Sequence, residues 1–147
     1  MATPREIDEI AIRQQIDTLV EAIRTMDLDR MKSIYAPDIV SFDIQPPLQH
    51  VGAEAKIKQW INVSTIFQRP LGYEVRDLTI TVGDDVAFGH CFGRLSGTLK
   101  NGNSTSGSWV RWTVGLRKID GNWLIVHDQI SVPTDVASGR ALLDLAP

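Results

Sequence analysis

Apolar residues near the start of the chain recur at intervals of three and four positions. They are Ile12, Ile16, Leu19, Ile23 and Met26. This spacing places them on one face of a long helix, and charged residues occupy the other faces. Thr3-Pro4-Arg5-Glu6 supplies the hydroxyl, proline and carboxylate of a capping box, which predicts that the helix begins at Pro4. We expect the apolar face to pack into a core.

Two shorter helices and one strand should follow. Asp27 can cap a second helix over residues 28–35, which Pro37 ends because the residue before a proline avoids the helical region. Residues 39–43 are β-branched and aromatic enough for a short strand. Residues 53–63 form the third predicted helix. Its expected apolar side carries Ile57, Trp60 and Ile61.

The second half of the chain has the period-two pattern of strands. Four long candidates cover residues 73–82, 86–99, 108–119 and 122–132, and Gly- and Asp-containing turns separate them. The Gly/Ser/Asn-rich segment 101–108 suits a hairpin tip. Helices first and strands afterwards predict an α+β fold, in which a strongly bent antiparallel sheet wraps around the helices. We expect one domain over residues 1–147.

Composition and charge narrow the class of protein. The 147 residues are 43% hydrophobic and 22% charged, as in an ordinary globular domain. The net charge of −3 gives no positive field for nucleic acid or anionic lipid, and no apolar run reaches the roughly 18 residues of a membrane span. The single cysteine, Cys91, cannot form an internal disulfide, and the first residues lead into a charged amphipathic segment. We therefore expect a cytoplasmic protein with no nucleic-acid or membrane partner.

Asp43 is the first candidate for chemistry. It ends an apolar strand and precedes the proline-containing loop 44–47, which could hold its carboxylate at the rim of a cavity. Partial desolvation would make that carboxylate a stronger base towards a proton next to a carbonyl. The alternative is a turn residue whose carboxylate binds backbone amides.

The last two long strands carry further candidates. His127 and Gln129 alternate with apolar residues, so they should project together, and a histidine can exchange protons near neutral pH. They could instead satisfy each other or a backbone group. Arg111, which shares a face with Thr113, could bind a carboxylate or stabilise an enolate, or it could pair with an acid on a neighbouring strand.

His90 and Cys91 are neighbours in the middle of a predicted strand, so they point to opposite faces and do not form a catalytic pair. Cys91 fits a small core residue. Asp43, His90 and His127 lack the local spacing of a metal site, so we expect no metal. The glycine-rich segment 102–107 lacks the ending of a phosphate-binding loop.

Two segments resemble a known family. Residues 27–43, DLDRMKSIYAPDIVSFD, and residues 120–133, DGNWLIVHDQISVP, are similar to the SnoaL-like, ketosteroid-isomerase-like branch of the nuclear transport factor 2 (NTF2) superfamily. The second segment also resembles the end of the association domain of calcium/calmodulin-dependent protein kinase. The resemblance covers nearly the whole chain. It implies a cone-shaped, cystatin-like α+β barrel with an internal pocket, and usually a homodimer formed through the sheets.

The resemblance also bears on individual positions. Asp43 falls where ketosteroid isomerases keep their general base. Leu19 falls at the position of their oxyanion-binding tyrosine and cannot donate a hydrogen bond. Thr113 or Gly115 occupies the region of their second acid. Gln129 stands where many small members have a second histidine, which keeps hydrogen bonding and loses a titrating group.

The leading hypothesis is a small-molecule enzyme of isomerase, cyclase or dehydratase type that needs no cofactor. Its substrate would be a small hydrophobic molecule that bears a carbonyl group, held inside the cone. The alternative is a non-catalytic ligand-binding or dimerisation module of the same fold. The expected catalytic residues are Asp43, His127 and Arg111. The expected substrate-binding residues are Gln129, His90, Trp60, Tyr35 and Thr113.

Overall fold

A computed structural model describes residues 1–147 and contains three helices, α1 (Pro4–Thr25), α2 (Leu28–Ile34) and α3 (Ala53–Ser64). The side chains of Thr3 and Glu6 form the predicted capping box, and Asp27 caps α2 through the backbone amide of Arg30. The predicted apolar face of α1 is buried. We expected Tyr35 to be the last residue of α2. It is instead the first residue of the first strand, because the backbone becomes extended there.

Nine strands accompany the helices. They are β1 (Tyr35–Phe42), β2 (His50–Val51), β3 (Gly72–Val82), β4 (Val86–Thr98), β5 (Ser104–Thr105), β6 (Trp109–Ile119), β7 (Asn122–Ser131), β8 (Thr134–Asp135) and β9 (Arg140–Ala141). The main sheet has the order β2-β1-β7-β6-β4-β3, and β5 pairs with β4. The meander β3-β4-β6-β7 is antiparallel as predicted, whereas β1 pairs with β7 in parallel. The fold is therefore the expected α+β class with an open, mixed sheet.

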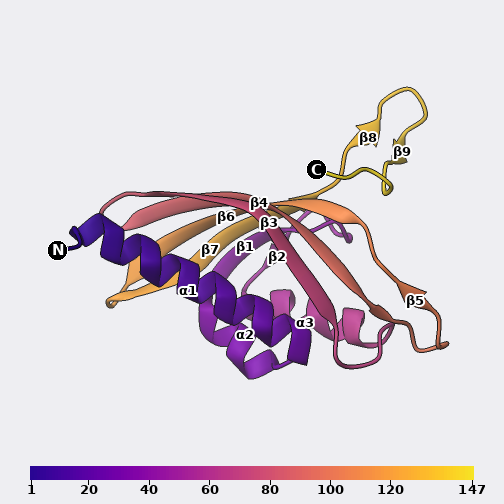
Figure 1. Ribbon diagram of the computed structural model, residues 1–147, viewed down its shortest axis with the longest axis horizontal. Helices are drawn as coiled ribbons and strands as arrows, with labels where there is room; N and C mark the ends of the chain where they lie inside the picture. Colours follow the sequence, from indigo (N-terminus) through magenta and orange to yellow (C-terminus); the bar gives the residue numbers. More distant parts are fainter.

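The sheet arches over the three helices, which lie together on its concave side (Figure 1). The core fills the space between these layers, and α1 contacts both β3 and β7. The fully buried members of the core come from the helices and from the inner face of the sheet. They include Ile12, Ile16, Leu19, Met31, Ile34, Ile39, Val114, Leu116 and Ile125.

A bulge in β7 decides which of its residues face the helices. Gly115 pairs with His127 and Leu116 pairs with Ile125, so Val126 is an extra residue without a partner. An extra residue shifts the alternation of side chains by one position. The inner face therefore carries Ile125 before the bulge and Asp128 after it, whereas His127 turns outward.

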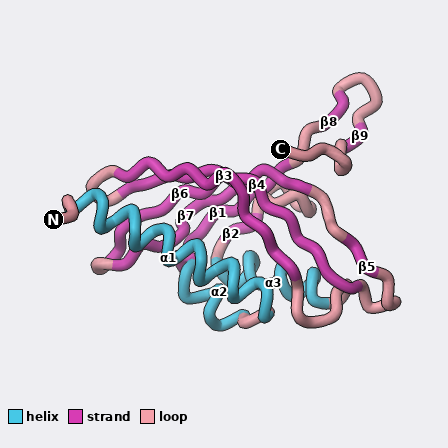
Figure 2. The backbone as a smooth tube through the Cα atoms, in the orientation of Figure 1, coloured by secondary structure: helices cyan, strands magenta, loops and turns pink.

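The inner face of β6 carries the apolar residues Val110, Trp112, Val114 and Leu116. The last three are buried in the core or in the cavity wall, so this apolar face is not available on the outside of the sheet. Beyond β7, the small β8–β9 hairpin stands clear of the body near the C-terminus (Figure 2). None of the three helices combines the length and hydrophobicity that a bilayer crossing requires.

Candidate functional site

A cavity of about 470 Å³ lies between the concave face of the sheet and helices α1 and α3. Most of its wall is apolar, with Leu19, Val63, Phe67, Leu95 and Leu99 among the lining residues. A volume of this size accommodates a small organic molecule. The charged groups of the wall are Asp43 directly after β1, Asp128 on β7 and Lys56 on α3.

The charged part of the wall is a buried ion pair. Lys56 Nζ on α3 lies 3.1 Å from Asp128 Oδ2 on β7, and each side chain is only 2% exposed. Asp128 also accepts hydrogen bonds from the Ser41 hydroxyl and from Trp112 Nε1, the latter at 3.3 Å. Lys56 Nζ donates in addition to Ser41 Oγ at 3.1 Å. These contacts compensate for the burial of both charges and leave Asp128 with three donors around it.

Asp43 differs from Asp128 in having free acceptor positions. It follows directly after β1, lines the cavity, and its side chain is 15% exposed. One oxygen, Oδ1, accepts a hydrogen bond from the backbone amide of Gln45 at 3.2 Å. The other, Oδ2, lies 3.6 Å from Lys56 Nζ, which is an ion pair with no hydrogen bond. Asp43 is thus both a turn residue and a cavity carboxylate with lone pairs left to accept a proton.

Tyr35 and Trp60, two of the expected substrate-binding residues, line the same cavity. Trp60 Nε1 donates to the Tyr35 hydroxyl oxygen at 3.1 Å, which leaves the phenolic proton of Tyr35 without an acceptor in the protein. Burial, followed by the negative charge of Asp128, raises the pKa of Tyr35 far above its ordinary value. The phenol therefore stays protonated and can donate a hydrogen bond to a ligand.

Tyr73 on β3 supplies a second phenol that the sequence pattern did not single out. It lines the cavity, its hydroxyl makes no hydrogen bond within the protein, and burial raises its pKa. Its hydroxyl lies against the backbone of Gly93, where an added Cβ would come within 2.6 Å of the oxygen. A glycine at this position makes room for the ring.

Three expected site residues lie on the outer face of the sheet. Arg111 is exposed and donates from Nε to the Ser131 hydroxyl at 3.1 Å, whereas Thr113 and His90 are exposed on β6 and β4. The inner positions beside them on β6 and β4 are Trp112 and Cys91. Arg111, expected as a catalytic residue, therefore does not line the cavity with Asp43, and the expected substrate-binding residues His90 and Thr113 do not line it either.

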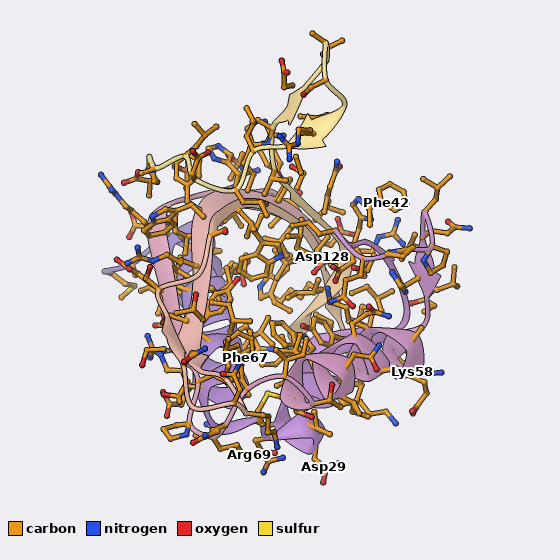
Figure 3. The ribbon with its side chains drawn as sticks, turned by 90° about the vertical axis from the view of Figure 1, so that its right-hand side faces the viewer. Asp29, Phe42, Lys58, Phe67, Arg69 and Asp128 are labelled. Carbon is orange, nitrogen blue, oxygen red and sulfur yellow. The ribbon has the colours of Figure 1, made fainter.

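His127 and Gln129 project together as expected, but also outward, because the Val126 bulge reverses the faces. His127 Nδ1 donates to the Val40 carbonyl at 2.7 Å, and its ring packs edge-on against Phe42 at 4.8 Å between centroids. Gln129 is exposed. In Figure 3, Asp128 lies inside the arch, whereas Phe42 lies at its outer edge.

Sequence reasoning missed Lys56, Gln59 and Asp128. One signal was available for Lys56: it stands three residues after Ala53 and four before Trp60, the spacing of a buried helical face. Ile61, which we expected on that face, is 43% exposed instead. Asp128 carried no comparable signal, since its inward direction depends on the bulge.

Comparisons with known proteins agree with this fold. Residues 12–135 match the SnoaL-like domain family. An NTF2-like protein of unknown function from Pseudomonas putida KT2440 is 31% identical, with 96% of this chain and 97% of that chain covered and a TM-score of 0.85. The chain therefore belongs to the SnoaL-like family of the NTF2-like superfamily.

More distant structures share the fold alone. A ketosteroid isomerase-like protein from Erwinia carotovora atroseptica is 20% identical, with 83% of this chain and 93% of that chain covered and a TM-score of 0.69. An NTF2-like protein with a cystatin-like fold from Novosphingobium aromaticivorans is 17% identical, with 95% of this chain and 90% of that chain covered and a TM-score of 0.76. No curated protein matches the sequence.

Proposed function

We propose that the protein is a small-molecule enzyme of isomerase, cyclase or dehydratase type, in which Asp43 removes a proton from the carbon next to a carbonyl group. The observation that carries this proposal is the position of Asp43, whose partly paired carboxylate lies at the wall of an apolar cavity. The lone pairs left free on this carboxylate can accept a proton, and a hydrophobic ketone fits such a wall.

Tyr35 is the group we propose for the developing negative charge. When Asp43 takes the proton, the C–H electron pair forms a carbon–carbon double bond, the π pair of the carbonyl group moves to its oxygen, and an enolate forms. A protonated phenol without another acceptor can donate to that oxygen, and a prearranged donor of this kind stabilises the transition state. Return of the proton from Asp43 to another carbon completes an isomerisation, whereas return to the same carbon restores the substrate.

Lys56 is a positioning residue in this proposal. Its ammonium lies between Asp128, which it contacts at 3.1 Å, and Asp43 at 3.6 Å. It thereby fixes the carboxylate of Asp43 relative to the sheet. Asp128 is already surrounded by donors, so it serves the network and leaves the base role to Asp43.

The test is exchange of the α-hydrogens of 2-tetralone, a hydrophobic carbon acid, with deuterated water, followed by NMR. We expect the protein to accelerate exchange and Asp43→Asn to lower that acceleration by at least about 100-fold, the usual contribution of general base catalysis. Asp38→Asn, an exposed substitution on β1, is the matched control and should leave the rate unchanged. Undiminished exchange in Asp43→Asn would refute the assignment.

The second candidate function is ligand binding without turnover, which the predominantly apolar wall favours. In that case the protein would bind 2-tetralone and leave its exchange rate at the solvent value. Asp43→Asn would then change neither binding nor exchange appreciably.

A further inference from the structure

Gln59 lies on α3 with its side chain against the cavity, although only 9% of the residue is exposed. Trp60 and Val63 of the same helix also line the wall. A buried amide is expected to have hydrogen-bond partners for both its nitrogen and its oxygen, because an unpaired buried polar atom costs about 1 to 3 kcal/mol.

The orientation of the Gln59 amide follows from its neighbour His50. His50 Nε2 lies 3.1 Å from the carbonyl oxygen of Gln45, which can only accept, so Nε2 carries the proton. In a neutral imidazole the other nitrogen, Nδ1, is then an acceptor. Nδ1 lies 3.1 Å from Gln59 Nε2, which therefore donates to it. This series of hydrogen bonds holds the amide nitrogen of Gln59 on the side that faces His50.

The amide oxygen of Gln59 remains without a hydrogen-bond donor. Gln59 Oε1 is a buried side-chain oxygen with no hydrogen-bond partner in the protein. In the tautomer with its proton on Nε2, His50 presents Nδ1 as an acceptor, so turning the amide round would bring two acceptors together. Gln59 as a residue lines the cavity, so this buried, unpaired acceptor is suited to a donor from a ligand that packs against the residue.

The charges of the wall indicate that the ligand is neutral. Lys56 is the cation among the residues that line the cavity, and Asp128 and Asp43 both face it. A ligand carboxylate would meet two existing carboxylates and no free cation, which is unfavourable in a largely apolar surrounding. A hydroxyl group adds a donor without adding charge.

We infer that Gln59 Oε1 accepts a hydrogen bond from a hydroxyl group of the ligand, so that the cavity selects a neutral, largely apolar hydroxy ketone. That the ligand carries a ketone rests on the proposed function. That it carries a hydroxyl group rests on Gln59 and His50 alone. It makes Gln59 a specificity-determining residue, which discriminates ligands by the unpaired acceptor they would otherwise leave buried.

Three naphthyl ketones of increasing substitution test this inference by equilibrium binding. They are 2-acetylnaphthalene, its 6-hydroxy derivative and its 6-methoxy derivative, titrated calorimetrically at a pH where the hydroxyl is protonated. We expect the hydroxy ketone to bind about tenfold more tightly than either other probe, as one hydrogen bond to a buried acceptor allows. In Gln59→Leu, which keeps a similar volume, this preference should fall to nearly one.

Matched variants separate the hydroxyl contact from other effects. Val63→Ala, one turn further along the same wall, should alter the affinity for all three probes alike and keep the preference. Asp43→Asn should also keep it. If Gln59→Leu does not fold, Gln59→Met serves as a second variant, since methionine retains the length of the side chain and lacks the amide.

Two results would overturn the inference. One is equal binding of the three probes by the unaltered protein, and the other is a preference that persists in Gln59→Met or Gln59→Leu. A preference lost in Asp43→Asn alone would move the hydroxyl contact to Asp43. Because these are binding measurements, they stand apart from 2-tetralone exchange: absent exchange with a Gln59-dependent preference would refute the proposed enzyme and retain the hydroxyl contact.

Discussion

Lys56 Nζ and Asp128 Oδ2 lie 3.1 Å apart in the interior and join helix α3 to strand β7. The Ser41 hydroxyl contacts both side chains, and the Trp112 indole donates to Asp128. The pair thus connects three strands and a helix at the wall of the cavity. Its energetics should govern both the stability of the fold and the placement of Asp43.

Replacing Lys56 with methionine should destabilise the protein by about 3 to 5 kcal/mol, because it leaves Asp128 buried without its cation. Urea unfolding at neutral pH, followed by tryptophan fluorescence, measures this loss. Lys58→Met is the matched control, since Lys58 is exposed two residues further along α3, and it should change stability little.

The double variant Lys56→Met/Asp128→Asn should recover part of the loss, because it removes the unpaired charge as well as the cation. Equal stability of Lys56→Met and the unaltered protein would contradict the importance of the pair. The same would follow if Lys58→Met were equally damaging.

Removing the hydroxyl of Tyr35 should affect both stability and turnover. Tyr35→Phe deprives Trp60 Nε1 of its acceptor, which should cost about 1 to 3 kcal/mol. If Tyr35 supports the enolate, the exchange rate of 2-tetralone at saturation should also fall by about 100-fold, with a smaller change in affinity.

Tyr73→Phe is the natural comparison, because the Tyr73 hydroxyl has no hydrogen-bond partner in the protein. Its stability should stay close to that of the unaltered protein. Thermal unfolding and exchange rates of both variants check the contrast. Greater destabilisation by Tyr73→Phe than by Tyr35→Phe would contradict it.

Asp8 should contribute to stability only above acidic pH. Its Oδ1 accepts from Trp123 Nε1 at 3.1 Å and from Lys118 Nζ at 3.0 Å, and these contacts lower its pKa below the ordinary 3.8. A group with a lowered folded pKa stabilises the protein above its unfolded pKa and loses that effect as the pH falls.

The urea midpoint of Asp8→Asn should therefore decline less between neutral pH and pH below 3.8 than that of the unaltered protein. Asp17→Asn, an exposed substitution on the same helix, should keep the original decline. An identical pH dependence in Asp8→Asn would show that these contacts do not stabilise its ionised form.

Cys91 should be unreactive in the folded protein. Burial raises the pKa of its thiol from 9.0 to about 12, and the thiolate is the reactive species. Alkylation by iodoacetamide, followed by mass spectrometry, should be at least about 100-fold slower in the native protein than in concentrated urea. Since the chain has one cysteine, the label reports this position directly, and rapid native labelling would contradict its burial.

Local sequence determined most of the elements. The capping box at Thr3 and Glu6 and the three-and-four spacing of α1 are properties of adjacent turns, so they are visible without the fold. The period-two pattern likewise predicted the four long strands, because alternation depends on the strand alone. The family followed from two segments of the sequence, and the match to residues 12–135 confirms it.

Only the tertiary structure decided the site. Alternation shows which residues share a face, but the Val126 bulge, which requires pairing with β6, turns Asp128 inward and His127 outward. Lysine is usually a surface residue. The burial of Lys56 depends on the carboxylates of Asp43, 13 residues before it, and Asp128, 72 residues after it. The position of Asp43 was predictable because it directly follows a strand with a recognisable pattern, whereas its partners are long-range contacts that no local pattern encodes.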